Sequence, residues 1–390
     1  MTGTNTTEIR LPALARMALV GIIVASGALM AALPANAAWR HVPSWHAQSP
    51  PVPAGAIASN LSAVSCSAQH ACAAVGDFEG SGSTFGTFAA SWNGISWTIR
   101  STPRPAVSSL NGVSCTTGRA CTAVGDELRG GAIVTLAERW NGTSWTVQPT
   151  PSPRGAAKSF LISVSCTSAT ACTATGFWAG PAGVQRTLAE HWNGRSWRIL
   201  RTPNPAGRAE VQFTGVSCTS ATACSAVGTF ASGTFAESWN GRTWTIRQTP
   251  VPSGGRDGFL GGVSCTSPSG CTATGSYFNG SRQVPLAEHW NGRRWTPQHA
   301  AAPAGPASSG LTGVSCVRAT RCTAVGFSGT TMLAERWNGA NWAVQGTRMP
   351  AGSPSASLGT VSCTSPAACT AVGFFTNASR TQTTLVERYS

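Results

Sequence analysis

Charged side chains are scarce in this chain of 390 residues. Only 10% of the residues are Asp, Glu, Lys or Arg, against about 25% in an average globular protein. Lys occurs only as Lys158, so Arg carries almost all of the positive charge in a formal net charge of +14. Because the Arg residues are scattered rather than clustered, the charge favours anionic partners only in general and does not indicate nucleic-acid binding.

The composition also argues against a helical bundle and against disorder. Helix formers other than Ala are few, whereas Gly (44 residues), Pro (24), Ser and Thr are abundant. Hydrophobic residues make up 42% of the chain, which is more than a disordered polar tail contains. The sequence lacks motifs for a Ser-His-Asp triad, a phosphate-binding loop or a metal site. We therefore expect a β-rich protein with no cofactor and no metal.

The N-terminal segment predicts a cleaved secretion signal. Basic residues precede an apolar run from Met17 to Leu33, and Ala35-Asn36-Ala37 provides the small residues that signal peptidase requires. Residues 1–37 are therefore expected to be a signal peptide, and residues 38–390 a single secreted, extracellular domain. The alternative is a retained segment that anchors the chain in a membrane.

The rest of the sequence repeats seven times, and each repeat contains one C-x5-C pair of cysteines. The pairs are Cys66/Cys72, Cys115/Cys121, Cys166/Cys172, Cys218/Cys224, Cys265/Cys271, Cys316/Cys322 and Cys363/Cys369. Paired cysteines in a chain expected to be secreted predict seven local disulfides, each within one hairpin. Zinc binding is disfavoured, because C-x2-C spacing is absent and the six histidines are scattered along the chain.

Each repeat predicts four short strands. After the hairpin that carries the cysteines, Leu136-Ala137-Glu138-Arg139-Trp140 predicts a third strand with Leu, Glu and Trp on one face. Asn141-Gly142 is typical of a type I′ turn, in which both residues have φ > 0. A fourth strand begins at Trp145, on the same sheet face as Trp140, and a Pro-x-Pro segment links one repeat to the next.

The two ends of the chain together complete one repeat. The seventh repeat stops after its third strand, whereas Trp45-His46-Ala47-Gln48 matches the missing fourth strand. A closed ring explains this division, because pairing the first strand with the last three removes the exposed edges. The sequence predicts an all-β, seven-bladed β-propeller of four-stranded blades, whose last blade is closed by the N-terminal strand. An open solenoid is the alternative.

The repeats also set the expected boundaries. Residues 38–53 are the closing strand and linker, residues 54–357 are blades 1 to 6, and residues 358–390 are three strands of blade 7. Over residues 38–390 the chain resembles secreted bacterial β-propeller repeat proteins of the kelch and Asp-box type. This resemblance implies an architecture and not a function, since propellers host many unrelated functions.

A Glu recurs at one position of the third strand, with Ala90 in its place in the first repeat. The six residues are Glu138, Glu190, Glu237, Glu288, Glu335 and Glu387. They could form a ring of carboxylates for metal binding or catalysis, but repetition in every blade is more typical of a structural group. We expect each Glu to be hydrogen-bonded to a neighbouring N–H or hydroxyl group. The repeated Trp pairs are expected to pack the core rather than to bind sugars.

One face of the propeller is expected to differ from blade to blade. The spacing from the second-strand Gly to the third-strand aromatic residue varies between repeats, so insertions fall on the same face as the Pro-rich links. Disulfide turns and Asn-Gly turns occupy the opposite, uniform face. Recognition is sought on the variable face. Its candidate ligand-binding residues are Asp77, Glu79, Asp126, Glu127, Trp178, Arg186, Tyr277, Arg282 and Arg380, and each could instead be an ordinary loop residue.

These features favour a secreted, non-catalytic binding or scaffold propeller. Its expected partner is an extracellular glycan, a cell-envelope polymer or a protein, and it is expected to be monomeric. A secreted hydrolase or lyase acting on polysaccharide is the alternative. Glycosidases normally use two carboxylates, and few acidic residues lie outside the repeated Glu position. A structural surface protein without a small ligand is a third interpretation.

Overall fold

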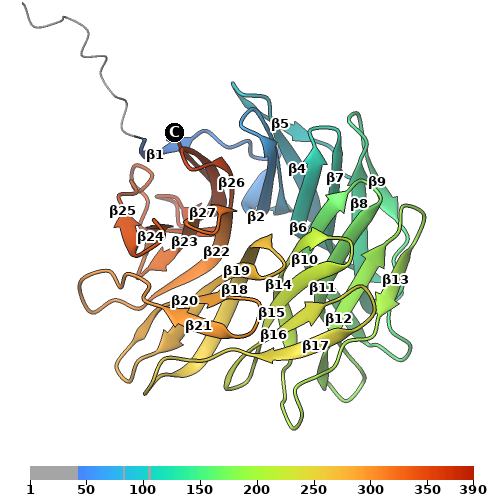
Figure 1. Cartoon of the computed structure of the whole chain (residues 1–390). Helices are drawn as coiled ribbons and strands as arrows, with labels where there is room; N and C mark the ends of the chain where they lie inside the picture. The colour runs from blue at the N-terminus through green and yellow to red at the C-terminus, as the bar shows by residue number, and fades with distance from the viewer. Residues whose placement is uncertain (1–42, 82–83, 104–106) are drawn as a thin grey trace, which may run out of the picture. The chain divides into compact units, whose positions relative to one another are not determined.

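The computed structural model describes residues 43–81, 84–103 and 107–390. Within these residues the regular secondary structure consists of strands β1 to β28, which belong to one unit from Pro43 to Ser390 (Figure 1). The predicted signal peptide lies outside the described residues. Among those described, no helix is long and apolar enough to span a bilayer.

The strands form seven blades in chain order. Blade 1 contains β2 (Ala56–Ala68), β3 (Ala71–Gly80), β4 (Thr84–Trp92) and β5 (Trp97–Arg100). Blade 2 contains β6 (Ser108–Thr117), β7 (Ala120–Arg129), β8 (Ala132–Trp140) and β9 (Trp145–Gln148). Blade 3 contains β10 (Lys158–Ser168), β11 (Ala171–Ala179), β12 (Gln185–Trp192) and β13 (Trp197–Leu200). Blade 4 contains β14 (Gln212–Ser220), β15 (Ala223–Phe230), β16 (Gly233–Trp239) and β17 (Trp244–Gln248).

The last three blades follow the same order. Blade 5 contains β18 (Arg256–Ser267), β19 (Gly270–Phe278), β20 (Gln283–Trp290) and β21 (Trp295–Gln298). Blade 6 contains β22 (Ser309–Arg318), β23 (Arg321–Ser328), β24 (Thr331–Trp337) and β25 (Trp342–Gln345). Blade 7 combines β26 (Ser355–Ser365), β27 (Ala368–Thr376) and β28 (Gln382–Tyr389) with β1 (Trp45–Gln48). It begins at Ser355, ahead of the expected boundary at 358. The predicted all-β, seven-bladed propeller is confirmed.

The first strand of each blade is the innermost one. Three residues from each of these seven strands, such as Asn111-Gly112-Val113, line a central channel of about 350 Å³. Every first strand carries a β-bulge at this level, as between Leu110 and Gly112. Neighbouring first strands approach closely there: a Cβ on Gly112 would lie 3.0 Å from the carbonyl oxygen of Ile162 in the next blade. Small residues at the bulge therefore let the blades meet around the channel.

Two kinds of contact close the ring. β1 pairs antiparallel with β28, with Trp45 opposite Tyr389. In addition, the backbone N–H of the first cysteine in every blade donates to the Ser hydroxyl of the preceding blade at 2.9–3.0 Å. The bond from Cys66 to Ser362 Oγ joins blade 1 to blade 7. The Val-Ser-Cys motif thus supplies one hydrogen bond between each pair of neighbouring blades, and these bonds run all the way around the closed ring.

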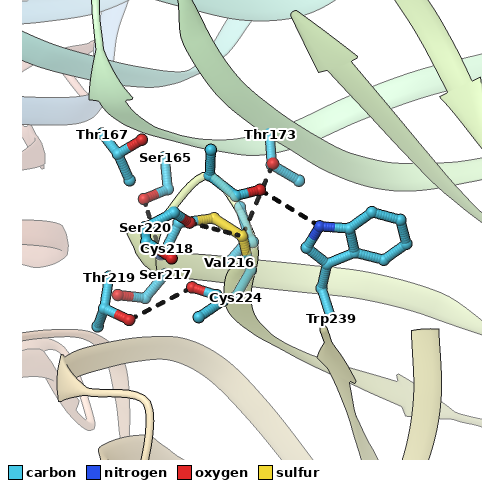
Figure 2. Close-up of a disulfide and its surroundings, with 12 residues drawn as sticks. Ser165, Thr167, Thr173, Val216, Ser217, Cys218, Thr219, Ser220, Cys224 and Trp239 are labelled. Atoms are coloured by element: carbon cyan, nitrogen blue, oxygen red, sulfur yellow. Dashed lines mark hydrogen bonds between the residues drawn. A yellow bond between two sulfur atoms is a disulfide. The ribbon is translucent and has the colours of Figure 1, made fainter. Parts of the chain in front are cut away.

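The seven C-x5-C pairs are disulfides within hairpins, as predicted. The two cysteines of each pair lie directly opposite each other, with Cα atoms 3.9–4.0 Å apart. Figure 2 shows the Cys218–Cys224 disulfide, where Thr173 Oγ1 of the preceding blade lies 3.7 Å from Cys224 Sγ. The described residues include no free cysteine. Each disulfide therefore fastens the first two strands of its blade beside the neighbouring blade.

The second cysteine of each disulfide lies in the core, and in three blades it lines none of the pockets described below. Cys172, Cys322 and Cys369 are only 1%, 2% and 1% exposed, and they do not line the channel either. Each Sγ atom instead lies 3.5–3.7 Å from a Thr hydroxyl of the preceding blade, namely those of Thr122, Thr272 and Thr323. The predicted pairing of these cysteines is confirmed. Their burial is consistent with the structural role that the sequence predicts for them.

Peptide mapping under non-reducing conditions should find all seven of these local disulfides. Closing such a short loop contributes roughly 2 kcal/mol of stability in the chain-entropy model. Replacing both Cys218 and Cys224 by Ala should therefore lower the melting temperature by several degrees without changing the oligomeric state. Free thiols in most pairs, or disulfides between blades, would contradict the hairpin register.

The Asn-Gly turns differ from the predicted type I′ geometry. Trp92 and Trp97 pair directly across a connection of four residues, and within it Gly94 has a φ of 98° while Asn93 is not left-handed. The Asn93 Oδ1 atom instead accepts the N–H groups of Ile95 and Ser96 at 2.9 Å. The Asn side chain caps the turn, so left-handed backbone at that residue is not required. Both Trp rings lie on one face, as predicted, with centroids 5.7 Å apart.

Candidate functional site

The two faces of the ring are built differently. We call the face with the disulfide turns and Asn-Gly turns the turn face, and the face with the second-to-third-strand loops and the blade links the loop face. On the turn face the two kinds of turn pack together within a blade: a Cβ on Gly94 would lie 2.8 Å from His70 Nδ1. On the loop face the loops differ in length, from two residues (130–131) to five (180–184). The loop face therefore carries the individual surface of the molecule.

Asp77 and Asp126 are the two candidates that the structure brings together across a blade boundary. They lie at the loop-face ends of β3 and β7, and Asn111 Nδ2 donates to Asp126 Oδ1 at 3.1 Å. Burial raises the pKa of Asp126 to about 6; the Asn111 bond opposes this rise, and the charge of Asp77 adds to it. The pKa of Asp77 is also raised by burial, against a hydrogen bond from Asn60. The pair is an acidic patch at blades 1 and 2.

Aromatic residues occupy the position of these acids in three other blades. They are Phe177, Phe327 and Phe374, and Phe177 stacks on Phe160 with ring centroids 4.7 Å apart. Phe374 keeps 36% of its surface exposed. None of these Phe residues was among the candidates from sequence. They could have been found from the sequence, because each directly follows the Gly that recurs in the second strand of every repeat. This position of the second strand is thus acidic in blades 1 and 2 and aromatic in blades 3, 6 and 7.

Glu79 and Glu127 lie at the ends of β3 and β7. Glu79 is half-buried and lines a small pocket that also includes Asp77 and Gln382 of blade 7. Glu127 is buried and forms an ion pair with Arg129 in the same strand. Its charge also contributes, after burial, to raising the pKa of Glu138. Glu127 is therefore directed inward and is engaged within its own blade.

Trp178 and Arg186 form a pair in blade 3. They lie opposite each other on β11 and β12, and the Arg186 guanidinium carbon is 5.9 Å from the Trp178 ring centroid. Trp178 is half-buried and packs against the core between blades 2 and 3, whereas Arg186 is exposed. The indole therefore belongs to a strand, and the guanidinium is the part that a ligand can reach.

Tyr277, Arg282 and Arg380 lie in other blades. Tyr277 is half-buried and lines a pocket of about 340 Å³ with His299 and Pro252. Arg282 donates to the carbonyl groups of two residues in the link between blades 5 and 6, and so has a structural role. Arg380 is exposed in the loop before β28, with a φ of 62°. Among the described contacts, none joins these three residues to the Asp pair or to Trp178.

The repeated Glu residues lie inside the blades and do not form a ring around the channel. All six are 0% exposed, and no acidic residue is among those that line the channel. Glu335 Oε2 accepts the N–H of Ala301 at 3.0 Å. In the other five, both carboxyl oxygens lack a hydrogen bond within the described part of the chain. The expected hydrogen bonds were therefore wrong at five positions. No group of three metal-ligating side chains occurs among the described residues.

Burial instead favours the neutral form of these carboxyl groups. It raises the pKa of Glu237 to about 9, those of Glu138, Glu190 and Glu288 to about 8, and those of Glu335 and Glu387 to about 7. Thr135 of blade 2 lies close enough to Glu190 to oppose part of this rise, without the geometry of a hydrogen bond. A protonated carboxyl group avoids the cost of burying a charge that has no partner.

The chain is similar in fold to solved β-propellers. "YCF48 bound to D1 peptide" is 14% identical, with 90% of this chain and 96% of that chain covered and a TM-score of 0.54. "YCF48 from Cyanidioschyzon merolae" is 12% identical, with 89% and 98% covered and a TM-score of 0.54. No protein-family model matches the sequence, and no curated protein matches it either. At these identities the similarity shows the fold alone.

Proposed function

We propose that this chain is a secreted, non-catalytic binding propeller that recognises an extracellular glycan, cell-envelope polymer or protein segment through its loop face. The observation that carries this proposal is the contrast between the two faces. The turn face repeats the same Asn-capped turn in six blades. The loop face presents loops of two to five residues whose side chains differ from blade to blade, on a ring held together by seven disulfides. Rigid scaffolds with individual loops are typical of recognition proteins.

Two further observations support parts of the proposal. Seven disulfides favour an oxidising compartment, as expected for a chain with a predicted signal peptide. One similar propeller, YCF48, is described as bound to D1 peptide, which supports a peptide as one class of partner. The mixed acidic and aromatic surface around Asp77, Asp126 and Phe374 has both the charge and the apolar area that peptide binding uses.

A polysaccharide-acting hydrolase or lyase is the second candidate, and one observation favours it. Asp126 has a pKa raised to about 6 beside a second carboxyl group, that of Asp77. Glycosidases use a pair of carboxyl groups, of which the one with the raised pKa acts as the general acid. Turnover of a polysaccharide that is lost in Asp126→Asn, but kept in Asn111→Ser, would favour the enzyme.

The binding proposal is tested by paired substitutions in blade 3. Arg186→Ala removes an exposed guanidinium from the loop face, and Arg195→Ala removes one from the turn face of the same blade. We expect Arg186→Ala to weaken binding to the best ligand of a panel of peptides, glycans and envelope polymers by about tenfold, as for a lost charged hydrogen bond. Arg195→Ala should bind normally. Affinities are measured by biolayer interferometry at low and moderate salt.

Equal losses from both substitutions that disappear in moderate salt would indicate diffuse charge attraction rather than a site. Both variants should keep the melting temperature of the native protein within a few degrees, because an exposed cation–π contact contributes only about 0.5–1 kcal/mol. Arg282 is unsuitable for this test, since its guanidinium holds the link between blades 5 and 6.

A further inference from the structure

The turn face has its own irregularity, at the residue before the third-strand aromatic ring. In five blades this residue is Arg or His: Arg139, His191, His289, Arg336 and Arg388. Arg388 lies over Trp92 of blade 1, with 4.7 Å from the guanidinium carbon to the ring centroid, and donates to the carbonyl of Gln69. Arg336 lies over Tyr389 of blade 7 at 4.5 Å. At these two boundaries the long cationic side chain fills the groove between the blades.

Blades 1 and 4 have a Ser at this position, Ser91 and Ser238. In these two blades an Arg of the fourth strand carries the positive charge instead. Arg100 then lies over Trp140 at 5.9 Å, and Arg247 over Trp290 at 5.6 Å. In four other blades a Gln occupies the place of Arg100 and Arg247, and three of these Gln residues bind a neighbouring Trp. Gln48, Gln148 and Gln298 accept a hydrogen bond from the fourth-strand Trp of the following blade at 2.8–3.1 Å. The pairing of Ser with Arg is therefore particular to blades 1 and 4.

This exchange leaves a pocket at each of the two boundaries, and the two pockets differ. Between blades 1 and 2, Arg100 Nε donates to Ser91 Oγ at 2.8 Å, and the remaining space is about 60 Å³. Between blades 4 and 5, Arg247 Nε is buried without a hydrogen-bond partner, and the pocket measures about 240 Å³. The space is thus much smaller at the first boundary than at the second, and we call the two the closed pocket and the open pocket. Arg247 therefore lacks the bond to the third-strand Ser that holds Arg100 in place.

The open pocket combines three kinds of surface. Trp239 and Trp290 provide aromatic walls, Arg247 provides the charge, and Ser238 and Ser269 provide hydroxyl groups. Figure 2 shows part of its blade 4 wall, with Ser217, Thr219 and Trp239. No acidic side chain is among the lining residues. Its volume is below the roughly 300–1,000 Å³ of pockets for drug-sized ligands, which suits one small ring.

We propose that this pocket between blades 4 and 5 binds a single pyranose ring that carries a carboxylate, such as a terminal uronic acid. The aromatic walls match the apolar face of a sugar ring. The guanidinium matches a carboxylate, which it can bind through two parallel hydrogen bonds. The serine hydroxyls match the hydroxyl groups of the sugar. The site lies on the turn face and so does not depend on the function proposed for the loop face.

Titration of the full chain with glucuronic acid, followed by isothermal calorimetry, tests the site. We expect one glucuronic acid per chain. Glucose lacks the carboxylate and acetate lacks the ring, so each should bind at least about tenfold more weakly. No saturable binding of glucuronic acid below about 10 mM would overturn the proposal. Binding of acetate as tight as that of glucuronic acid would also overturn it, because the pocket would then take an anion and no sugar.

Two variants and a matched control locate the binding. Arg247→Gln introduces the residue found at this position in blades 2, 5, 6 and 7, and Ser238→Arg introduces the cation that fills the groove in blades 6 and 7. Each should weaken glucuronic acid binding by at least about tenfold. Arg100→Gln, at the closed pocket, should leave it unchanged. If Ser238→Arg fails to fold, the affinity of Arg247→Gln for glucuronic acid alone decides whether this pocket is the binding site. Equal losses in Arg247→Gln and Arg100→Gln would overturn the assignment to this pocket.

Discussion

Deleting residues 43–53 should lower the melting temperature by roughly 10 °C and produce dimers. The deletion removes β1, whose Trp45 is 3% exposed and whose Gln48 accepts a hydrogen bond from Trp97 of blade 1. Loss of a buried Trp alone typically costs about 3–5 kcal/mol, and each kcal/mol shifts the melting temperature by about 2–4 °C in a protein of 150–250 residues. The freed edge of β28 then offers unpaired N–H and C=O groups to a second chain. Calorimetry and light scattering measure the two effects.

Trp45→Ala is the matched control for this deletion. It removes the buried ring but keeps the strand that pairs with β28. It should lower the melting temperature and leave the protein monomeric. Unchanged stability and monomeric behaviour after the deletion would indicate that β1 does not close the ring.

The stability of the protein should fall as the pH rises from about 5 to 9. The six buried Glu carboxyl groups have pKa values raised from 4.5 to between about 7 and about 9. Between these values and 4.5 the folded protein binds more protons than the unfolded chain, so unfolding releases protons and is favoured by higher pH. Their neutral form stabilises fully below about pH 4.5, and this contribution is lost as the pH passes through the folded pKa values. Each pKa unit corresponds to about 1.4 kcal/mol.

Unfolding free energies at pH 5, 7 and 9, with the disulfides intact, measure this dependence. Glu237→Gln should make the dependence less steep and should be more stable than the native protein at pH 9, because an amide cannot ionise. Glu335→Gln should change the slope less, since the pKa of Glu335 is about 7 and its Oε2 already accepts the N–H of Ala301. Stability that is flat or rises between pH 5 and 9 would show that these groups are ionised in the folded protein.

The fold could be predicted because each repeat carries its own local signals. C-x5-C places two cysteines across a hairpin, and Trp45 repeats the pattern of Trp145, so both the blade and the ring closure are visible in one sequence. The turn type could not be predicted, because the Oδ1 atom of Asn93 caps the backbone where left-handed φ was expected. The turn propensity of Asn cannot distinguish a left-handed backbone from a capping side chain, because Asn favours both.

The candidate site was less predictable because it depends on contacts between residues in different blades. Asp77 and Asp126 are 49 positions apart in the sequence, and only the ring brings their charges together. Arg282 was a candidate for ligand binding, but its guanidinium is engaged by the backbone of residues 303 and 307. The open pocket beside Arg247 was missed for the same reason, although the exchange of Ser238 for Arg or His is visible in the repeats.

Hydrogen–deuterium exchange of the full chain, with and without the ligand that binds it best in the panel, tests the proposed function most directly. We predict slower exchange on the loop face, at residues 129–132, 179–185, 278–283 and 376–382 and at the Pro-rich links. Amides of the Asn-capped turns at residues 141–144 and 193–196 should exchange as in the free protein. Slower exchange confined to those turns, or no change at the loops in a saturated complex, would contradict recognition by the loop face.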